Sequence, residues 1–352
     1  MKVAVYAIAL NEVAHVERWA TSARDADVRV VADTGSTDGT QQSLRDLGVT
    51  VHEIHVKPWR ADVARNAALA LVPPDVDYCV MMDMDEVLTE GWRDHLEEAH
   101  RQGWTRPRFR YVFSWRADGT PDVTYKGDRI HTRSGYRWCY PAHDILKPEG
   151  IKETQGWTGL EIHHHPTPGR ARPDYMPGLE VAVREMPTDA RMAHYYAREL
   201  MYVQRFKEAA AEFRRYLALP GATWKPERAA SMRYLAQCVP AEDVEWLQRA
   251  VRETPGQREP WVELAAAFRR RKEWLPCYVA ATAALLIVEK GIEYPEGSAA
   301  WGSAPYDEAA QAAHRLGWRD EAIRHGTRAI ELSPEDQRLR ANMTFFEKGL
   351  EG

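Results

Sequence analysis

The sequence predicts two domains: an α/β domain over residues 1–186, with a mostly parallel sheet and antiparallel hairpins, and an all-helical repeat domain over residues 187–352. Three observations lead to this fold class. The chain has 352 residues, enough for about two domains. Short apolar runs alternate with amphipathic stretches through the first part of the chain. Beyond Pro187 the composition turns to Ala, Arg, Glu and Leu in a recurring pattern.

The first part alternates strands and helices in the order typical of βαβ units. We expect strands at Val3–Ile8, Val28–Val31, Val49–Val56 and Tyr78–Met82. Helices are expected at Glu12–Ala23, in a stretch ending near Gly48, and at Ala61–Leu71. A ligand site should lie at the carboxyl ends of these strands. Three polar clusters stand there: Asn11-Glu12, Asp33–Asp38 and Asp83–Glu86.

Beyond Gln102 the alternation of aromatic and polar residues predicts antiparallel hairpins. The expected strands are Phe109–Trp115, Thr124–Ile130 and Tyr136–Tyr140, with turns at Asp118-Gly119 and Ser134-Gly135.

The second half carries a tetratricopeptide-like pattern of small and aromatic residues. Its fullest copies contain Trp261, Leu264, Ala265, Phe268, Ala281 and Ala284, then Tyr306, Gly317, Ala322, Ala329 and Pro334. Earlier and weaker copies contain Ala197, Ala209 and Phe213, then Ala250 and Pro255. We expect four helical hairpins stacked as a short solenoid.

Composition limits the class of protein. The formal net charge is −5, and residues 186–352 are neutral. Four scattered cysteines show no metal-ligand spacing, which favours reduced thiols. The longest nearly apolar run, Tyr278–Val288, has 11 residues, whereas a bilayer span takes about 20. We therefore expect a soluble, cytoplasmic protein.

The most informative acidic cluster is Asp83-Met84-Asp85-Glu86, after a predicted buried strand. If that strand continues, Asp83 and Asp85 point to the same side, and their mutual repulsion favours a bound cation. Mg²⁺ or Mn²⁺, completed by substrate phosphates, suits such a site. The alternative is an acidic loop that caps a helix beginning near Thr89.

Two further clusters suggest a nucleotide site. Asp33 follows a strand and can accept from a base N–H or a ribose hydroxyl, although a plain βα turn would have the same sequence. Arg65 follows Arg60 by a turn and a half of the expected helix, within reach of a diphosphate. Solvated surface arginines are the alternative.

These motifs, in this order, resemble the nucleotide-sugar half of family-2 glycosyltransferases with the Rossmann-like GT-A fold. The resemblance rests on Asn11-Glu12, Asp33–Asp38, Ala64-Arg65-Asn66, Asp83–Glu86, His143-Asp144 and Ile162–His165. With the repeats, the chain resembles the tetratricopeptide-fused branch of that family. That branch includes bacterial peptide S-glycosyltransferases and phage-encoded glycosyltransferases.

The resemblance implies a role for each matching residue. Donor-binding roles fall to Asn11, Glu12, Asp33, Asp38, Arg60, Arg65, Asp83, Trp138 and His143. Asp85 would bind the divalent metal. Asp144 would be the catalytic base, although many members of the branch carry Glu there. One histidine of His163–His165 would complete the metal site; alignment points to His164, with His163 close behind and a surface histidine cluster as the alternative.

The expected function is a metal-dependent, inverting glycosyltransferase that uses a nucleoside-diphosphate sugar, preferably a UDP-sugar. A protein or peptide acceptor is favoured because helical repeats offer a concave groove. Residues 101–137 carry nine basic and three acidic residues among interleaved aromatics. That segment suits a sugar diphosphate, or a DNA acceptor with modified bases in a phage context. A non-catalytic scaffold with a degenerate nucleotide-binding domain is the other alternative.

Overall fold

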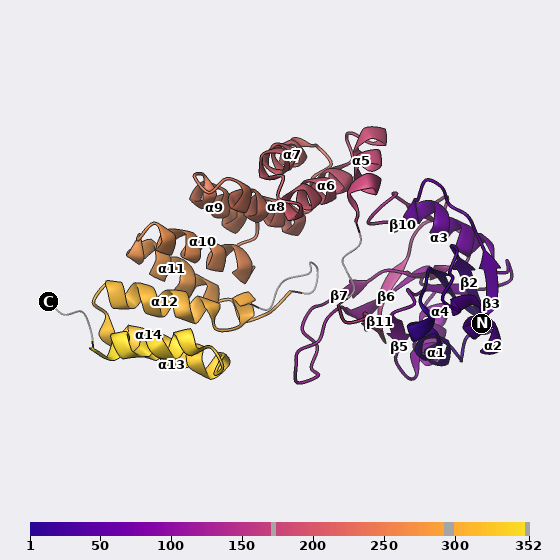
Figure 1. The fold of residues 1–352 in the computed structure, drawn as a ribbon, viewed down its shortest axis with the longest axis horizontal. Coiled ribbons are helices and arrows are strands. Elements are labelled where there is room, and N and C mark those ends of the chain that lie inside the picture. Colours follow the sequence, from indigo (N-terminus) through magenta and orange to yellow (C-terminus); the bar gives the residue numbers. More distant parts are fainter. Residues whose placement is uncertain (170–173, 292–298, 349–352) are drawn as a thin grey trace. The chain divides into compact units, whose positions relative to one another are not determined.

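The chain divides into two compact units, Met1–Glu185 and Met186–Gly352 (Figure 1). The computed structural model describes residues 1–169, 174–291 and 299–348. The division falls one residue before the boundary expected from the change in composition. Each unit is described by itself.

A five-stranded sheet in the order β3-β2-β1-β4-β8 forms the centre of the first unit. Its strands are β1 (Val3–Ala9), β2 (Val28–Asp33), β3 (Thr50–Glu53), β4 (Tyr78–Met81) and β8 (Ile130–Thr132). Strands β1 to β4 are parallel and β8 runs antiparallel to β4, so the expected mostly parallel sheet is confirmed. Strand β3 is shorter than expected, because this edge strand has only β2 to pair with.

Two smaller sheets carry the later strands. The four-stranded sheet has the order β5-β11-β6-β7, and β9 pairs with β10 alone. These strands are β5 (Glu86–Leu88), β6 (Arg106–Val112), β7 (Thr124–Gly127), β9 (Tyr136–Cys139), β10 (Ile145–Pro148) and β11 (Gln155–His164).

One of the two expected hairpins forms and the other does not. Strands β6 and β7 pair antiparallel across the Asp118-Gly119 turn, as expected. The hairpin expected at Ser134-Gly135 was wrong, since β8 joins β4 of the central sheet and β9 pairs with β10. The alternating pattern favoured two strands there, but each strand buries its apolar side chains in a different core: Ile130 in one, Trp138 in the other.

The alternating side chains of the central sheet build a core on each face. One core receives α1 (Val13–Ser22), α2 (Thr40–Asp46) and α4 (Trp92–Arg101). The other receives α3 (Ala61–Ala70) and Trp138 of β9. Helix α4 starts at Trp92, after Gly91, and not near Thr89. The last helix of the unit is α5 (Met176–Glu185).

The second unit is all-helical. Its α-helices are α6 (Ala190–Tyr202), α7 (Phe206–Ala218), α8 (Lys225–Cys238), α9 (Asp243–Glu253), α10 (Arg258–Arg270), α11 (Trp274–Leu285), α12 (Ala304–Arg315), α13 (Arg319–Leu332) and α14 (Gln337–Lys348), with a 3₁₀ turn at Ala299–Trp301.

Consecutive helices of this unit pack in pairs as tetratricopeptide-like hairpins. The pairs are α6/α7, α8/α9, α10/α11 and α12/α13, followed by α14. The small residues of the repeat pattern are buried where helices meet, as with Ala209, Ala265 and Ala322 at 0% exposure. The predicted all-α repeat fold is confirmed for the part of the unit that the structure describes. Among the described residues, no helix is long and apolar enough to span a membrane.

Candidate active site

Two loops at the carboxyl ends of β1 and β2 are fastened to each other by hydrogen bonds. The backbone N–H of Asn11 donates to Ser36 Oγ at 2.8 Å, and the side-chain Oδ1 of Asn11 accepts from the Thr37 N–H at 2.9 Å. Asp38 Oδ2 accepts from the Val13 N–H at 3.1 Å. Asn11 and Asp38 are thus brought together as expected, and the hydrogen bonds of both fix the shape of this loop pair.

Asp33 is the buried end of β2, and its two carboxylate oxygens differ. Oδ1 accepts from the N–H groups of Gly35 and Ser36 and from Gln41 Nε2, at 2.8 to 3.0 Å. Oδ2 is buried and has no hydrogen-bond partner within the described residues. A buried carboxylate oxygen without a donor is costly, so a ligand N–H or hydroxyl suits this position. The backbone N–H of Glu12, which follows Asn11, donates to Thr40 Oγ1 at 2.8 Å.

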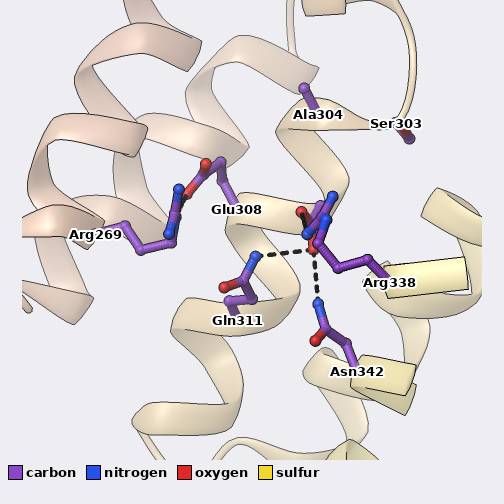
Figure 2. Close-up of a pocket in the computed structure, with 8 residues that line it drawn as sticks. Arg269, Ser303, Ala304, Glu308, Gln311, Arg338 and Asn342 are labelled. Carbon is purple, nitrogen blue, oxygen red and sulfur yellow. Dashed lines mark hydrogen bonds and ion pairs between the residues drawn. The ribbon is translucent and has the colours of Figure 1, made fainter. Parts of the chain in front are cut away.

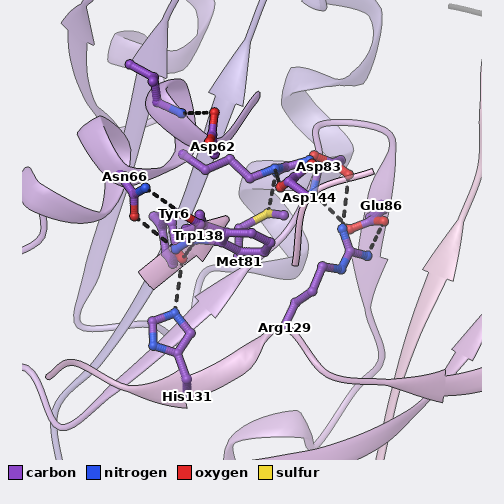
Figure 3. A network of polar contacts seen from close by, with 12 residues as sticks. Tyr6, Asp62, Asn66, Met81, Asp83, Glu86, Arg129, His131, Trp138 and Asp144 are labelled. Carbon is purple, nitrogen blue, oxygen red and sulfur yellow. Dashed lines mark hydrogen bonds and ion pairs between the residues drawn. The ribbon is translucent and has the colours of Figure 1, made fainter. Parts of the chain in front are cut away.

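Arg65 joins two carboxylates that lie far apart in the sequence, Asp83 and Asp144. Figure 3 shows these two acids close to each other. Arg65 Nη1 lies 3.0 Å from Asp83 Oδ1, and its Nε lies 2.6 Å from Asp144 Oδ2. Helix α3 supplies the arginine, the loop after β4 supplies Asp83, and the loop between β9 and β10 supplies Asp144. The indole of Trp138 lies below the guanidinium, 5.1 Å from ring centre to Cζ. The structure therefore gathers the expected base and a donor-binding acid around one cation.

Asp83 and Asp85 do not lie on a strand, so the expectation that they point to the same side was wrong. Strand β4 ends at Met81, and a turn follows, closed by the Glu86 N–H donating to the Asp83 carbonyl at 3.0 Å. Asp83 faces the arginines and Asp85 faces His164. In this structure the two carboxylates therefore have separate partners.

Arg129 and Glu86 stabilise that turn through contacts with Asp83. Arg129 Nη1 lies 3.0 Å from Asp83 Oδ2, and its Nη2 contacts Glu86. Glu86 is 1% exposed, accepts from the Tyr111 hydroxyl at 2.5 Å, and accepts from the Asp83 N–H at 2.8 Å. From the sequence, Glu86 is part of the acidic cluster and Arg129 is one of the basic residues of segment 101–137, but neither has an assigned role. Pairing of Arg129 with the half-buried Asp83 and the buried Glu86 depends on tertiary contacts that the spacing could not show.

The cluster divides its carboxylates into two kinds. Although burial opposes it, the charges of Arg65 and Arg129 lower the pKa of Asp83 to about 2. Burial raises the pKa of Asp144, and Arg65 only partly offsets this. Asp83 is therefore held ionised, whereas Asp144 keeps its proton to a higher pH than an ordinary Asp. This difference suits one acid that holds a ligand and a second that accepts a proton.

Asp85 and His164 form a second pair, with Asp85 Oδ2 at 3.3 Å from His164 Nε2. His164 Nδ1 lies 3.0 Å from the Phe113 carbonyl oxygen, which can only accept, so Nδ1 carries a proton. In the neutral ring Nε2 then presents its lone pair to a carboxylate, and a proton or a cation must lie between them. Although burial opposes it, the hydrogen bond to Asp85 raises the pKa of His164.

This pair fits a divalent metal that is completed by its substrate. Among the described residues, no group of three or more His, Cys, Asp or Glu side chains could hold an ion. Mg²⁺ and Mn²⁺ commonly take one or two protein ligands and fill the remaining positions with water and phosphate oxygens. One carboxylate oxygen and one imidazole nitrogen meet that description. His163 instead contacts Glu161 at 2.9 Å.

Three other predicted donor-binding residues have local roles. Arg60 contacts Asp62 at 3.1 Å and Glu185 of α5 at 3.0 Å, so it does not join Arg65 in one diphosphate grip here. Trp138 is buried, and its Nε1–H donates to the Tyr6 hydroxyl at 2.8 Å. His143 has a positive φ of 49° and its ring packs on Tyr175, 4.6 Å between centres. Their contact with a donor stays a prediction.

The basic segment 101–137 is not an open cationic surface. Six of its nine cations lie in ion pairs with carboxylates: Arg101, Arg106, Arg108, Arg110, Arg116 and Arg129. Arg133 donates to the Val72 carbonyl. Some of the paired acids belong to other elements, such as Glu98 of α4 and Glu161 of β11, so the charge count of the segment does not show these pairs. The interpretation of this segment as a site for a sugar diphosphate or a DNA acceptor stays a prediction.

The helical unit has a polar pocket of about 400 Å³, shown in Figure 2. Asp307 of α12 accepts from Arg338 at 2.5 Å and from Gln311 at 2.9 Å. Arg269 Nε lies 2.7 Å from Glu308. Each charge is therefore balanced within the pocket, and the side-chain N–H groups of Gln311 and Asn342 both donate to Asp307. The lining residues are Arg269, Ser303, Ala304, Asp307, Glu308, Gln311, Arg338 and Asn342.

Comparison with known proteins identifies a glycosyltransferase homologue for the N-terminal half. The chain is 26% identical over 178 residues to the lipopolysaccharide core biosynthesis glycosyltransferase LpsC of Rhizobium meliloti (strain 1021). The match covers 47% of this chain and 64% of that protein, so the chain spans less than two thirds of its relative. The relationship is one of distant homology. No protein-family model matches the chain.

The solved structures to which the chain is similar have low overall similarity to it. PilF of Pseudomonas aeruginosa has a TM-score of 0.38 and 16% identity, covering 49% of this chain and 72% of that one. YrrB, described as a TPR protein with an unusual peptide-binding site, has a TM-score of 0.39 and 14% identity, covering 48% and 82%.

Proposed function

We propose that this protein is a metal-dependent glycosyltransferase that moves a sugar from a nucleoside diphosphate, preferably UDP, to a macromolecular acceptor. The observation that carries the proposal is the cluster of Asp83 and Asp144 on Arg65, beside the Asp85–His164 pair. These side chains come from separate elements of the chain. Distant homology to a glycosyltransferase supports the same class of reaction.

The residues divide the work of a single displacement. Asp33 Oδ2 accepts a hydrogen bond from the base, and Asp83 accepts one from a ribose or sugar hydroxyl. Asp85 and His164 would hold Mn²⁺ or Mg²⁺, and such an ion would supply positive charge for the departing diphosphate. Asp144 takes the proton of the acceptor while the acceptor atom bonds to the anomeric carbon and the bond from that carbon to the diphosphate oxygen breaks. One displacement inverts the anomeric centre.

Arg65 links donor binding to the strength of the base. Its guanidinium contacts the carboxylates of both Asp83 and Asp144. A bound diphosphate supplies a stronger partner for this cation. Asp144 then loses part of its charge compensation, which makes it a better proton acceptor when the acceptor arrives.

The acceptor we propose is a protein or a peptide. The helical unit supports this, because its polar pocket offers Gln311 and Asn342 together with charges that are already balanced. Such amide groups pair with peptide backbone without favouring a strongly charged partner. The DNA alternative has less support, since most cations of the basic segment are ion-paired with acids.

The test separates binding from transfer. The intact chain, Mn²⁺ and a panel of UDP-, GDP- and dTDP-sugars are incubated with bacterial peptides, proteins or hydroxymethylated DNA, and products are identified by mass spectrometry. Asp144→Asn should keep the Mn²⁺-dependent affinity for the donor and lower transfer by about a thousandfold or more. Asp118→Asn, on the exposed hairpin, is the matched control. Retained turnover in Asp144→Asn would place the base elsewhere.

A further inference from the structure

A half-exposed aromatic ring stands directly beside the candidate metal pair. Phe113 follows β6, and its ring lies parallel to the imidazole of His164, at 5.1 Å between centres and 13° between planes. The same residue holds His164 through its carbonyl oxygen, at 3.0 Å from Nδ1. The Phe113 N–H donates to the Val123 carbonyl at 2.8 Å, so the hairpin fixes the ring in place.

The exposure of this ring sets it apart from a purely supporting one. His164 contacts a second ring, that of Tyr111, which is 4% exposed, at 6.4 Å between centres. Phe113 is 45% exposed. One of its faces covers the imidazole, and the ring of Tyr125 lies 6.3 Å from it at 40° between planes, so the exposed area belongs to the rest of the ring. A supporting role for His164 needs only the covered face and leaves the exposed part of the ring without a function.

The position of the ring identifies the chemistry of its partner. In a nucleoside-diphosphate sugar, the sugar is bonded directly to the phosphate that a metal at Asp85 and His164 would hold. The acceptor must approach the same anomeric carbon. Aromatic rings favour partners with polarised C–H groups at their faces, as one side of a pyranose ring presents. Ligand sites typically combine such a ring with a few polar groups, here Asp85 and His164.

We propose that the exposed part of the Phe113 ring binds a pyranose ring, either the sugar of the donor or a sugar of the acceptor, an inference that rests on the proposed function. Trp115 supports His164 from the same hairpin: its Nε1–H donates to the His164 carbonyl at 3.1 Å, and its indole lies parallel to His165 at 5.4 Å. Because His164 and Tyr125 both pack on the Phe113 ring, it needs no rearrangement to receive a sugar.

The test compares Phe113→Ala with Phe345→Ala, which removes a ring that is 61% exposed on α14 of the other unit. Two probes are titrated with Mn²⁺ present: UDP alone, and UDP-glucose or whichever nucleotide sugar the wild type binds best. Methyl β-D-glucopyranoside and methyl α-D-mannopyranoside are examined separately by saturation-transfer NMR, with and without UDP. Phe113→Trp should restore binding, whereas Phe113→Leu should not.

If the donor sugar lies on Phe113, Phe113→Ala should lower the affinity for the nucleotide sugar by roughly threefold to tenfold, while the affinity for UDP stays unchanged. An acceptor sugar predicts that both nucleotide affinities are unchanged and the methyl glycoside signal is lost. The proposal is overturned if neither changes, or if the UDP affinity falls equally, since the ring would then only support His164. If the wild type binds no nucleotide, the proposed function fails, and the glycoside signal alone decides this proposal.

Discussion

At the scale of single residues, the site depends on two carboxylates with opposite tendencies. Asp83 contacts two arginines at 3.0 Å and stays ionised, whereas burial raises the pKa of Asp144. The sequence predicted both residues but could not assign these states, because Arg129 reaches Asp83 from 46 positions away. Asp33 was predicted correctly as buried after a strand, and its unpaired Oδ2 appears only in three dimensions.

The raised pKa of Asp144 makes a prediction about the pH dependence of transfer. A raised pKa means that the carboxyl keeps its proton to a higher pH than the ordinary 3.8 of Asp, and a protonated carboxyl cannot accept another. The rate at saturating substrate should therefore fall as the pH falls through this raised value. The measurement is kcat against pH, with recovery of activity at neutral pH as the control for unfolding. A rate that stays constant down to the ordinary range of Asp would contradict the assignment.

At the scale of elements, the sequence predicted most strands of the central sheet but failed at two places: the loop before β9 and the end of β4. The strand pattern correctly indicated β1, β2 and β4, whose apolar residues fill the two cores. It was wrong about the Ser134-Gly135 hairpin, since alternation shows that a strand exists without showing its partner. The strand expected to end at Met82 ends at Met81. The idea that Asp83 and Asp85 continue it was wrong, since Arg129 pairs with Asp83 and Glu86, and the Asp83 N–H donates to Glu86, which stabilises a turn there.

A buried hydrogen-bond chain links Trp138 of β9, Tyr6 of β1 and His131 of β8 (Figure 3). The Trp138 Nε1–H donates to the Tyr6 hydroxyl at 2.8 Å, and that hydroxyl lies 3.0 Å from His131 Nε2. His131 Nδ1 lies 2.8 Å from the Thr132 carbonyl oxygen, so Nδ1 carries the proton and Nε2 accepts from Tyr6. The chain requires a neutral His131, and burial lowers the pKa of this histidine to about 4.

This histidine makes the first unit less stable in acid. The unfolded chain binds a proton at His131 near pH 6.5 and the folded chain only near pH 4, so the free energy of unfolding should fall as the pH falls between these values. The loss amounts to about 3 kcal/mol at most. Urea unfolding at pH 7 and pH 4.5 measures it. His131→Gln should flatten this pH dependence, whereas His52→Gln on the exposed strand β3 should not; equal slopes in all three proteins would contradict the account.

At the scale of the whole molecule, an α/β unit with a candidate catalytic edge is joined to a tetratricopeptide-like unit with a polar pocket. The change in composition near Pro187 predicted this division, because repeated helices need small residues at their contacts and a parallel sheet does not. The net charge was a poorer guide. Residues 101–137 carry an excess of six positive charges, but most of them are neutralised by acids from α4, β11 and nearby loops.

The central claim is that Asp85 and His164 bind a divalent metal that holds a nucleotide sugar. The most direct measurement is the Mn²⁺-dependent affinity of the intact chain for a panel of UDP-, GDP- and dTDP-sugars, by calorimetry, compared with Asp85→Asn and with the hairpin variant Asp118→Asn as the control. We predict that one nucleotide class binds the wild type and Asp118→Asn only with Mn²⁺ or Mg²⁺, and that Asp85→Asn lowers this affinity at least tenfold with an unchanged circular dichroism spectrum. Equal affinity in Asp85→Asn, or no nucleotide bound by the wild type with metal, would contradict the account.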